Sequence, residues 1–285
     1  MHSMANILSE IVSHKEREVA ALKAFQPETD LRRLAQEAPP ARDFFAALTQ
    51  HPQPDTTAVI SEIKRKSPSA GWIRGAYRPE EDGGDGFRPE DIARRYHRAG
   101  ASAISCLTDE HFFGGDLSYI ERVRSAVPLP VLRKDFLIDP WQIFQSRAAG
   151  ADAVLLIAEC LDDARLTEML ELAVGLGMTV LLESHDRTNL HRLEKLVSGP
   201  HRKHCLFGIN NRDLTSMTVD LGHTLELARD VSDPNTLVSE SGIRTPADLH
   251  RLRLGGVRIV LVGEHLMAQP DPGAALAELL APPAG

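Results

Sequence analysis

The stretch SEIKRKSPSAG, residues 61–71, places charged side chains directly after an apolar, β-prone run. Glu62 and Lys64 stand at the end of this run, and a short turn through Ser67 follows. A carboxylate and an ammonium at a strand end can exchange protons with a bound substrate. A polar turn of this size can hold a phosphate. The alternative is a plain solvated strand end, and the ends of the other apolar runs decide between the two.

Polar and charged residues end the other apolar runs as well. They are Thr108, Lys134, Glu159, Glu183, Asn210 with Arg212, Ser241-Gly242 and Gly263-Glu264. One such residue is typical of any solvated strand end. A set of them at nearly every strand end indicates an active site, because the carboxyl ends of parallel strands meet at one edge.

The two lysines at strand ends, Lys64 and Lys134, suit protonation of a carbonyl oxygen or formation of a Schiff base. Close cations lower each other's pKa, and carboxylates such as Glu62 and Glu183 act in the opposite direction. The alternative is that Lys134 simply pairs with Asp135. Adjacent residues of a strand face opposite ways, so the sequence favours a chemical role for Lys134.

Short apolar runs and amphipathic helical patterns alternate from residue 57 onward. The runs span 57–63, 101–107, 129–135, 151–157, 178–184, 205–211, 236–242 and 257–263. The helical patterns span 89–100, 117–127, 139–150, 162–177, 187–199, 223–231, 245–256 and 272–281. Consecutive apolar positions favour strands that are buried on both faces of a parallel sheet. Eight such units predict a closed (β/α)₈ barrel, with the charged strand ends at one mouth.

An open, doubly wound sheet is the alternative fold, and the lack of a G-x-G-x-x-G motif after the first strand argues against it. Residues 5–24 predict an amphipathic helix, and residues 44–48 predict a short one after the Pro-rich stretch near Pro39-Pro40. We expect a helical extension over residues 1–50, packed on a barrel formed by residues 51–285. The acidic, Gly-rich segment 75–91 predicts a flexible surface loop, either a lid or a disordered insertion.

Two glycine turns follow the seventh and eighth predicted strands, in SESGIRTPAD (239–248) and LVGEHL (261–266). Backbone N–H groups at a helix N-terminus attract anions, and glycine lets a phosphate approach. Phosphate sites after these two strands recur in barrels. The pair of turns therefore predicts a phosphate site, to which Ser67 could add a hydroxyl.

Composition narrows the class of protein. The chain has 285 residues, a formal net charge of −8 and three scattered cysteines. This charge argues against a broad nucleic-acid surface, and the odd, sparse cysteines indicate a reducing compartment. The sequence shows no apolar run of membrane-spanning length and no signal peptide, so we expect a cytoplasmic protein. The dispersed histidines predict no metal site, and His185 is expected in a surface loop.

The motifs, taken in order, resemble one family, indole-3-glycerol phosphate synthase. They are ILSEIVSHKEREVAALK near the N-terminus and then EIKRKSPSAG, LTDEHFFGG, LRKDF, ADAVLLI, LLESHD, GINNRDL, SESGI and LVGEHLM. This resemblance covers nearly the whole chain. It implies a barrel enzyme of tryptophan biosynthesis that acts on 1-(2-carboxyphenylamino)-1-deoxyribulose 5-phosphate. Ring closure with loss of CO₂ and water would give indole-3-glycerol phosphate, without a metal or an organic cofactor.

The resemblance also implies roles for individual residues. The catalytic positions are Glu62, Lys64, Lys134, Glu183, Asn210 and Ser241. The substrate or phosphate contacts are Ser67, Arg212, Gly242, Gly263 and Glu264, and the aromatic pocket wall is Phe113, Phe136 and Leu155. One lysine would protonate the alkoxide, and the other would hold the substrate carboxylate until CO₂ leaves. Dehydration needs an acid for the hydroxyl and a base for the anilino proton, with Glu183 and Glu62 as candidates.

Three features depart from the family's pattern. Ala70 replaces the lysine of the common SPSKG motif, so it cannot supply a cation near the phosphate. Glu264 stands where some relatives have Ser, so its backbone N–H is expected to bind while its charge points away. The segment 75–91 is longer than expected. These departures bear on substrate affinity and loop closure.

Two other functions remain open from the sequence alone. A Schiff-base aldolase of the same barrel type would use Lys134 as its nucleophile. A non-catalytic sensor of phosphorylated ligands would bind without turnover, but it would need no acid–base set such as Glu62 and Glu183. We expect a single activity, a small phosphorylated aromatic substrate as the partner, and a monomer or a weak homo-oligomer.

Overall fold

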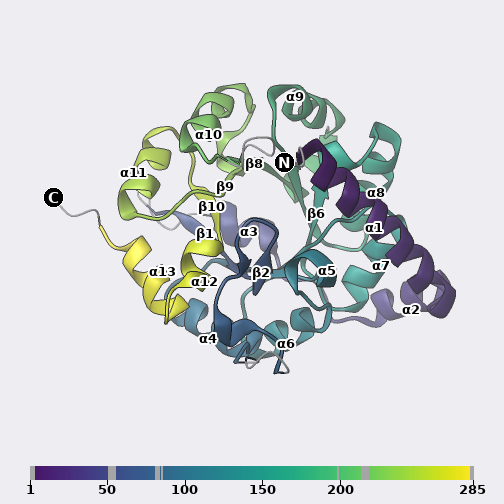
Figure 1. Ribbon diagram of the computed structural model, residues 1–285. Coiled ribbons are helices and arrows are strands. Elements are labelled where there is room, and N and C mark those ends of the chain that lie inside the picture. The colour runs from purple at the N-terminus through teal and green to yellow at the C-terminus, as the bar shows by residue number, and fades with distance from the viewer. Residues whose placement is uncertain are drawn as a thin grey trace.

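The computed structural model describes residues 4–50, 56–80, 84, 86–197, 199–212 and 218–282, with the side chains of the first helix described from Ile7 onward. Eight parallel strands close into a barrel in the order β1-β10-β9-β8-β7-β6-β5-β4 (Figure 1). The strands are β1 (Ala58–Ile63), β4 (Ala103–Leu107), β5 (Val131–Lys134), β6 (Ala153–Ile157), β7 (Thr179–Ser184), β8 (Cys205–Asn210), β9 (Leu237–Glu240) and β10 (Ile259–Val262). Nearly every strand residue is buried, so the predicted (β/α)₈ barrel is confirmed.

Helices surround the barrel strands, as the alternating pattern predicts (Figure 1). They are α4 (Pro89–Arg98), α6 (Ser118–Ala126), α7 (Pro140–Ala148), α8 (Asp163–Gly175), α9 (Arg187–Leu196), α10 (Leu221–Leu227), α11 (Pro246–Leu254) and α13 (Pro272–Leu280). Two short helices, α5 (Glu110–Phe113) and α12 (Glu264–Ala268), lie in the connections after β4 and β10. Asp139 and Thr245 form capping boxes at the starts of α7 and α11, which explains why helix starts could be located in the sequence.

The barrel interior forms its own apolar cluster. It contains Ile60, Leu132, Leu181 and Leu206 from four different strands, together with Phe44 and Leu48 of helix α3 (Phe44–Thr49). Both α3 side chains are fully buried. Helix α3 contacts β1 and β4. The backbone N–H of Arg42, just before α3, donates to Asp152 at the start of β6. Helix α3 therefore closes the amino end of the barrel and leaves the carboxyl end for the site.

Two longer helices precede α3. Helix α1 (Met4–Phe25) confirms the predicted helix, and α2 (Glu28–Glu37) was not predicted. Helix α2 buries only Leu31 and Ala35, which pack against Trp141 and Phe144 of α7. Its apolar face is thus too small to stand out in the sequence. The proposed boundary between extension and barrel, at residues 50 and 51, remains a prediction because residues 51–55 are outside the described part.

The connection after β1 contains short ordered elements ahead of segment 75–91 and at its start. It forms a small hairpin of β2 (Lys66–Ser67) and β3 (Gly71–Trp72), followed by a 3₁₀ turn, η1 (Gly75–Tyr77). Tyr77 and Phe87 are buried, and the Phe87 ring centroid lies 5.4 Å from that of Tyr119 on α6. Tyr77 and Phe87 therefore hold this segment on the barrel flank, while Ala76, Arg78 and Gly86 are exposed as in a surface loop, and Pro89 begins α4. Residues 81–83 and 85 lie outside the described residues.

Within the described part of the chain, no helix has the length and apolar character that crossing a membrane requires.

Candidate active site

A cavity of about 410 Å³ opens at the carboxyl ends of the barrel strands. Every residue for which the family resemblance implies a role lies in its wall, whereas Thr108 and Glu159 of the polar strand ends do not. The wall includes Glu62, Lys64, Ser67, Phe113, Lys134, Phe136, Leu155, Glu183, Asn210, Arg212, Ser241, Gly242, Gly263 and Glu264. The fold thus brings together residues from all parts of the barrel, while their individual roles remain predictions. None of the described residues of segment 75–91 is in this wall, which gives the lid hypothesis no support.

Lys134 bridges two carboxylates in the cavity wall. Its Nζ lies 2.5 Å from Glu183 Oε2 and 3.1 Å from Glu240 Oε2. Burial lowers the pKa of Lys134, but the carboxylates of Glu183, Glu240 and Glu62 raise it by more, so Lys134 is a stable cation. Burial alone would raise the pKa of Glu183, whereas Lys134 holds it below its usual value. Burial and the nearby Glu183 raise the pKa of Glu240, which therefore accepts a proton more readily.

Asn210 connects Glu183 to the turn after β9. Its Nδ2 donates to Glu183 Oε1 at 3.2 Å, and its Oδ1 accepts from Ser241 Oγ at 2.8 Å. Ser241 has a φ of 69°, which lies in the left-handed region that few non-glycine residues adopt. The buried Asn211 holds this conformation by donating to the Ser241 carbonyl at 3.1 Å. Strained backbone of this kind is concentrated at functional sites, and here it directs a hydroxyl toward Asn210.

Glu62 and Lys64 form a second ion pair, with 2.6 Å between Lys64 Nζ and Glu62 Oε1. Gly263 makes room for this pair, because a Cβ at position 263 would lie 2.2 Å from Glu62 Oε1. Gly208 acts in the same way, since a Cβ there would lie 2.3 Å from Glu240 Oε1. Both glycines thus allow a carboxylate to lie against the neighbouring backbone.

The cavity has apolar and polar walls. Phe113 and Phe136 lie with their ring centroids 6.0 Å apart, and both face the cavity, as a wall for an aromatic ring requires. Arg212 Nη2 lies 3.4 Å from Glu264 Oε2, so Glu264 lines the cavity with its charge balanced by an arginine. Thr245 caps the start of α11, and this connection contributes Ser241, Gly242, Ile243 and Arg244 to the cavity wall.

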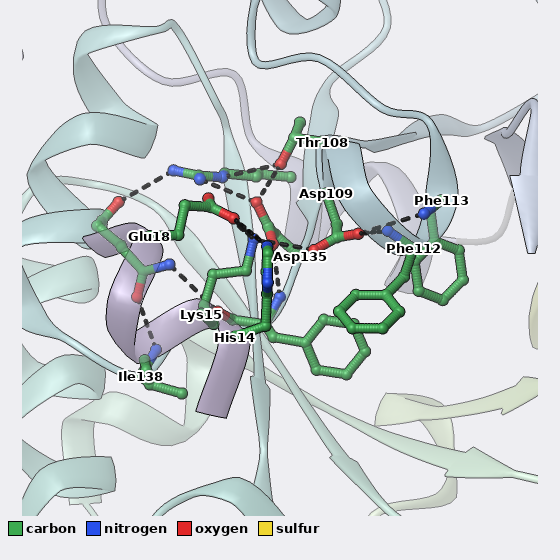
Figure 2. A network of polar contacts seen from close by, with 12 residues as sticks. His14, Lys15, Glu18, Thr108, Asp109, Phe112, Phe113, Asp135 and Ile138 are labelled. Carbon is green, nitrogen blue, oxygen red and sulfur yellow. Dashed lines mark hydrogen bonds and ion pairs between the residues drawn. The ribbon is translucent and has the colours of Figure 1, made fainter. Parts of the chain in front are cut away.

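Helix α1 covers part of the cavity and is anchored there by Lys15. The side chain of Lys15 is fully buried, and its Nζ lies 3.0 Å from Asp109 Oδ2 and 3.1 Å from Asp135 Oδ1 (Figure 2). Asp109 also caps α5, accepting from the backbone N–H groups of Phe112 and Phe113. Three residues of α1 line the cavity: Ile7, Leu8 and Ile11. Lys15 therefore joins α1 to a wall of the site and to the end of β5.

The alternative pairing of Lys134 with Asp135 is wrong. Asp135 also lines the cavity, but its carboxylate pairs with Lys15 and with Arg133, whose Nη2 lies 3.0 Å from Asp135 Oδ2. These cations overcome the effect of burial and lower the pKa of Asp135 to about 2. Thr108, another predicted strand end, is buried beside this group and donates to Asp135 at 2.6 Å.

Sequence reasoning missed two acid–base groups of the cavity wall that lie beside Lys134 and Glu183, namely Glu240 and His185. Glu240 is the last residue of β9, and the sequence pattern favoured the following Ser241-Gly242 as the strand end. The position of Glu240 directly before the Ser241-Gly242 turn could have indicated that it belongs to the site. His185 was expected in a surface loop, but its side chain is only 14% exposed and lines the cavity. Strand β7 ends at Ser184, directly before His185. A search of the residue that follows each predicted strand would therefore have found His185.

Within the described residues, no group of three or more His, Cys, Asp and Glu side chains is arranged to hold a metal ion. A reaction without metal or cofactor remains a prediction.

A (β/α)₈ barrel with paired ammonium and carboxylate groups at its carboxyl end defines an acid–base enzyme for a small ligand. The family model described as "Indole-3-glycerol phosphate synthase" matches residues 8–279 of the chain. This chain belongs to the indole-3-glycerol phosphate synthase family, whose members are carbon–carbon lyases of tryptophan biosynthesis.

Close relatives support this assignment over the full length. The chain is 46% identical to the indole-3-glycerol phosphate synthase of Acidovorax sp. (strain JS42), covering 98% of this chain and 100% of the relative. It is also 46% identical to that of Rhodopirellula baltica (strain DSM 10527 / NCIMB 13988 / SH1), covering 96% and 99%. Among solved structures, a 3-hexulose-6-phosphate synthase matches with a TM-score of 0.59 and 17% identity, covering 78% of this chain and 97% of that one. The last comparison supports the fold alone.

Proposed function

We propose that the cavity binds 1-(2-carboxyphenylamino)-1-deoxyribulose 5-phosphate and that Lys134 protonates the ketone oxygen during ring closure. The observation that carries this proposal is the position of Lys134 between Glu183 and Glu240. Two carboxylates keep its ammonium charged, as a proton donor must be. A Schiff-base nucleophile would need the neutral amine, so the same geometry speaks against an aldolase.

The cavity suits the three parts of this substrate. The aromatic ring would lie against Phe113 and Phe136, and the phosphate would lie near Gly242 and Arg212. The ketone would then face Lys134, between the two ends. Lys64 would hold the substrate carboxylate, because a primary ammonium is a strong partner for an anion.

The steps follow from this placement. The ring carbon that carries the carboxylate attacks the ketone, and the oxygen takes a proton from Lys134. The bond to CO₂ then breaks, and its electron pair returns to the ring. The hydroxyl leaves as water after taking a second proton, and a base removes one proton from the new five-membered ring. We assign these last two transfers to Glu62 and Glu183, with Asn210 orienting the hydroxyl through its contact with Ser241.

Turnover of the substrate, followed by indole fluorescence, tests this assignment. Lys134→Ala should reduce kcat by roughly 10²-fold or more, because a positioned acid contributes about 10²–10⁴-fold. Lys64→Met is the matched variant, and it should raise KM as well, because Lys64 contacts the substrate in the ground state. Full activity of Lys134→Ala would refute the mechanism, and saturable binding without turnover by the unmodified chain would favour the sensor.

A cytoplasmic location and a monomeric or weakly associated state remain proposals. The first is supported by Cys106, Cys160 and Cys205, none of which forms a disulfide.

A further inference from the structure

His185 lies in the cavity wall between two carboxylates that its ring nitrogens face from opposite sides. Nε2 lies 3.7 Å from Glu183 Oε1, and Nδ1 lies 3.4 Å from Glu159 Oε2. Neither ring nitrogen has a hydrogen-bond partner among the described residues, and Glu159 Oε2 has none either. The steps assigned above use neither His185 nor Glu159. This arrangement places an unpartnered imidazole beside a carboxylate of the proposed site.

The groups continue into a row that ends at the proposed acid. Glu183 uses Oε1 toward His185 and Oε2 toward Lys134, which lies 2.5 Å away. Glu159 is held at the outer end by the backbone N–H of His185 at 2.9 Å and by Asn189 at 3.2 Å. Glu159 lies outside the cavity wall. The row therefore leads from the acid in the cavity to a carboxylate beyond the wall.

The proposed reaction requires a proton from solvent. Each turnover uses two protons, one for the ketone oxygen and one for the departing hydroxyl, and it returns one from the five-membered ring. The balance is one proton taken up, since the substrate carboxylate leaves as neutral CO₂. Lys134 must regain its proton before the next turnover, and its side chain, 13% exposed, lies in the wall of the cavity that the substrate and product would fill.

We propose that Glu159, His185 and Glu183 form a proton path that recharges Lys134 after each turnover, which rests on the proposed role of Lys134 as the acid. The imidazolium of His185 gives its Nε2 proton to Glu183 Oε1. Rotation of the carboxyl group brings this proton to the neutral amine of Lys134. The neutral imidazole keeps its Nδ1 proton, so the ring turns over to bring its free nitrogen toward Glu159, and that nitrogen takes one proton from solvent. Both distances exceed a normal hydrogen bond, so each transfer needs a side-chain shift of roughly 0.5–1 Å.

The surroundings of His185 favour its charged form. Burial lowers the pKa of His185, but Glu159 and Glu183 raise it by more, and Glu240 from β9 adds to the rise. His223 of α10 also faces this segment, where its Nε2 lies 2.9 Å from the His185 carbonyl oxygen. Steady-state kcat should fall as the pH rises through the pKa of His185, because the path needs the imidazolium.

Comparison of first and later turnovers of His185→Gln tests the path. Glutamine keeps a polar side chain but cannot carry a proton through a ring. In rapid-quench experiments with enzyme in excess, Lys134 starts protonated, so the first turnover should keep its wild-type rate. The steady-state rate should fall roughly tenfold or more. Added imidazole should restore part of that rate, and the fall of kcat at high pH should disappear.

Glu159→Gln should show the same division between first and later turnovers, without a change at the cavity wall. His223→Gln is the matched control, and imidazole should not alter its rate. Equal losses in the first and later turnovers of His185→Gln, or a steady-state rate and pH profile like those of the wild type, would overturn the path. Failure of the proposed function is distinguishable, because Lys134→Ala would then stay active whatever happens at His185.

Discussion

At the scale of single residues, the site depends on positions where the backbone takes an unusual course or where a side chain is missing. Ser241 keeps a left-handed φ so that its hydroxyl reaches Asn210. Gly263 has no side chain, and Glu62 occupies the space that a Cβ would take. These two features place functional groups without being functional groups themselves.

Replacing Gly263 by alanine should therefore displace Glu62. The added Cβ would lie 2.2 Å from Glu62 Oε1, a distance that forces the carboxylate to move away from Lys64. Misplacement of a catalytic group by about 1 Å can cost about 100-fold in rate, so kcat of Gly263→Ala should fall by that order. Gly175→Ala is the control, because nothing lies within 4 Å of a Cβ there. Normal turnover by Gly263→Ala would contradict this account of Glu62.

At the scale of elements, helix α1 is part of the site. It contributes Ile7, Leu8 and Ile11 to the cavity wall, and the buried Lys15 fixes it to the α5 cap and to the end of β5 (Figure 2). Removing this ammonium would leave the buried Asp109 without an ion-pair partner among the described residues and Asp135 with Arg133 alone.

Lys15→Met should lower the free energy of unfolding by about 3–5 kcal/mol, because Asp109 and Asp135 would remain buried without this partner. Urea unfolding followed by circular dichroism measures the loss. Lys23→Met is the matched control on the same helix. Lys23 pairs with Asp139 at 2.7 Å but is 39% exposed, so the change should cost about 0–1 kcal/mol. Equal stability losses in the two variants would show that the buried charge does not anchor the helix.

At the scale of the whole molecule, the free energy of unfolding should depend on pH through buried ion pairs. Arg133 and Lys15 lower the pKa of Asp135 from 3.8 to about 2 in the folded chain, against the opposing effect of burial. A carboxylate with a lowered folded pKa stabilises the fold above its unfolded pKa, and this contribution is lost as the pH falls from about 4 to about 2. The loss should be on the order of 2 kcal/mol.

Urea midpoints measured from pH 7 down to pH 2 would detect this loss. The urea midpoint of the wild type should fall most between about pH 4 and pH 2. Over the same range, the midpoint of Asp135→Asn should fall by less. The variant should be less stable at pH 7 and change less with acid. Parallel curves for the two proteins would assign the acid sensitivity to other carboxylates.

Much of the architecture could be predicted because its signals are local. Each barrel strand is a short run of apolar residues, and capping residues such as Thr245 mark helix starts. The site followed from the fold, since parallel strands end at one mouth. What could not be predicted depends on distant partners. Helix α2 is stabilised by Trp141, which is far away in the sequence, and Lys15 has the same sequence pattern as a solvated lysine on an amphipathic helix.

The closed strand order also determines when the molecule can be completed during synthesis. Strand β1 leaves the ribosome before the other barrel strands, yet its neighbour β10 is the last one made, with Ser61 opposite Val262. Until β10 emerges, β1 and β9 each present an unpaired edge, which is a template for aggregation. A chain that stops before Ile259 would therefore reach the cell's quality control as an aggregation-prone fragment, even though nearly all residues of the site are already present.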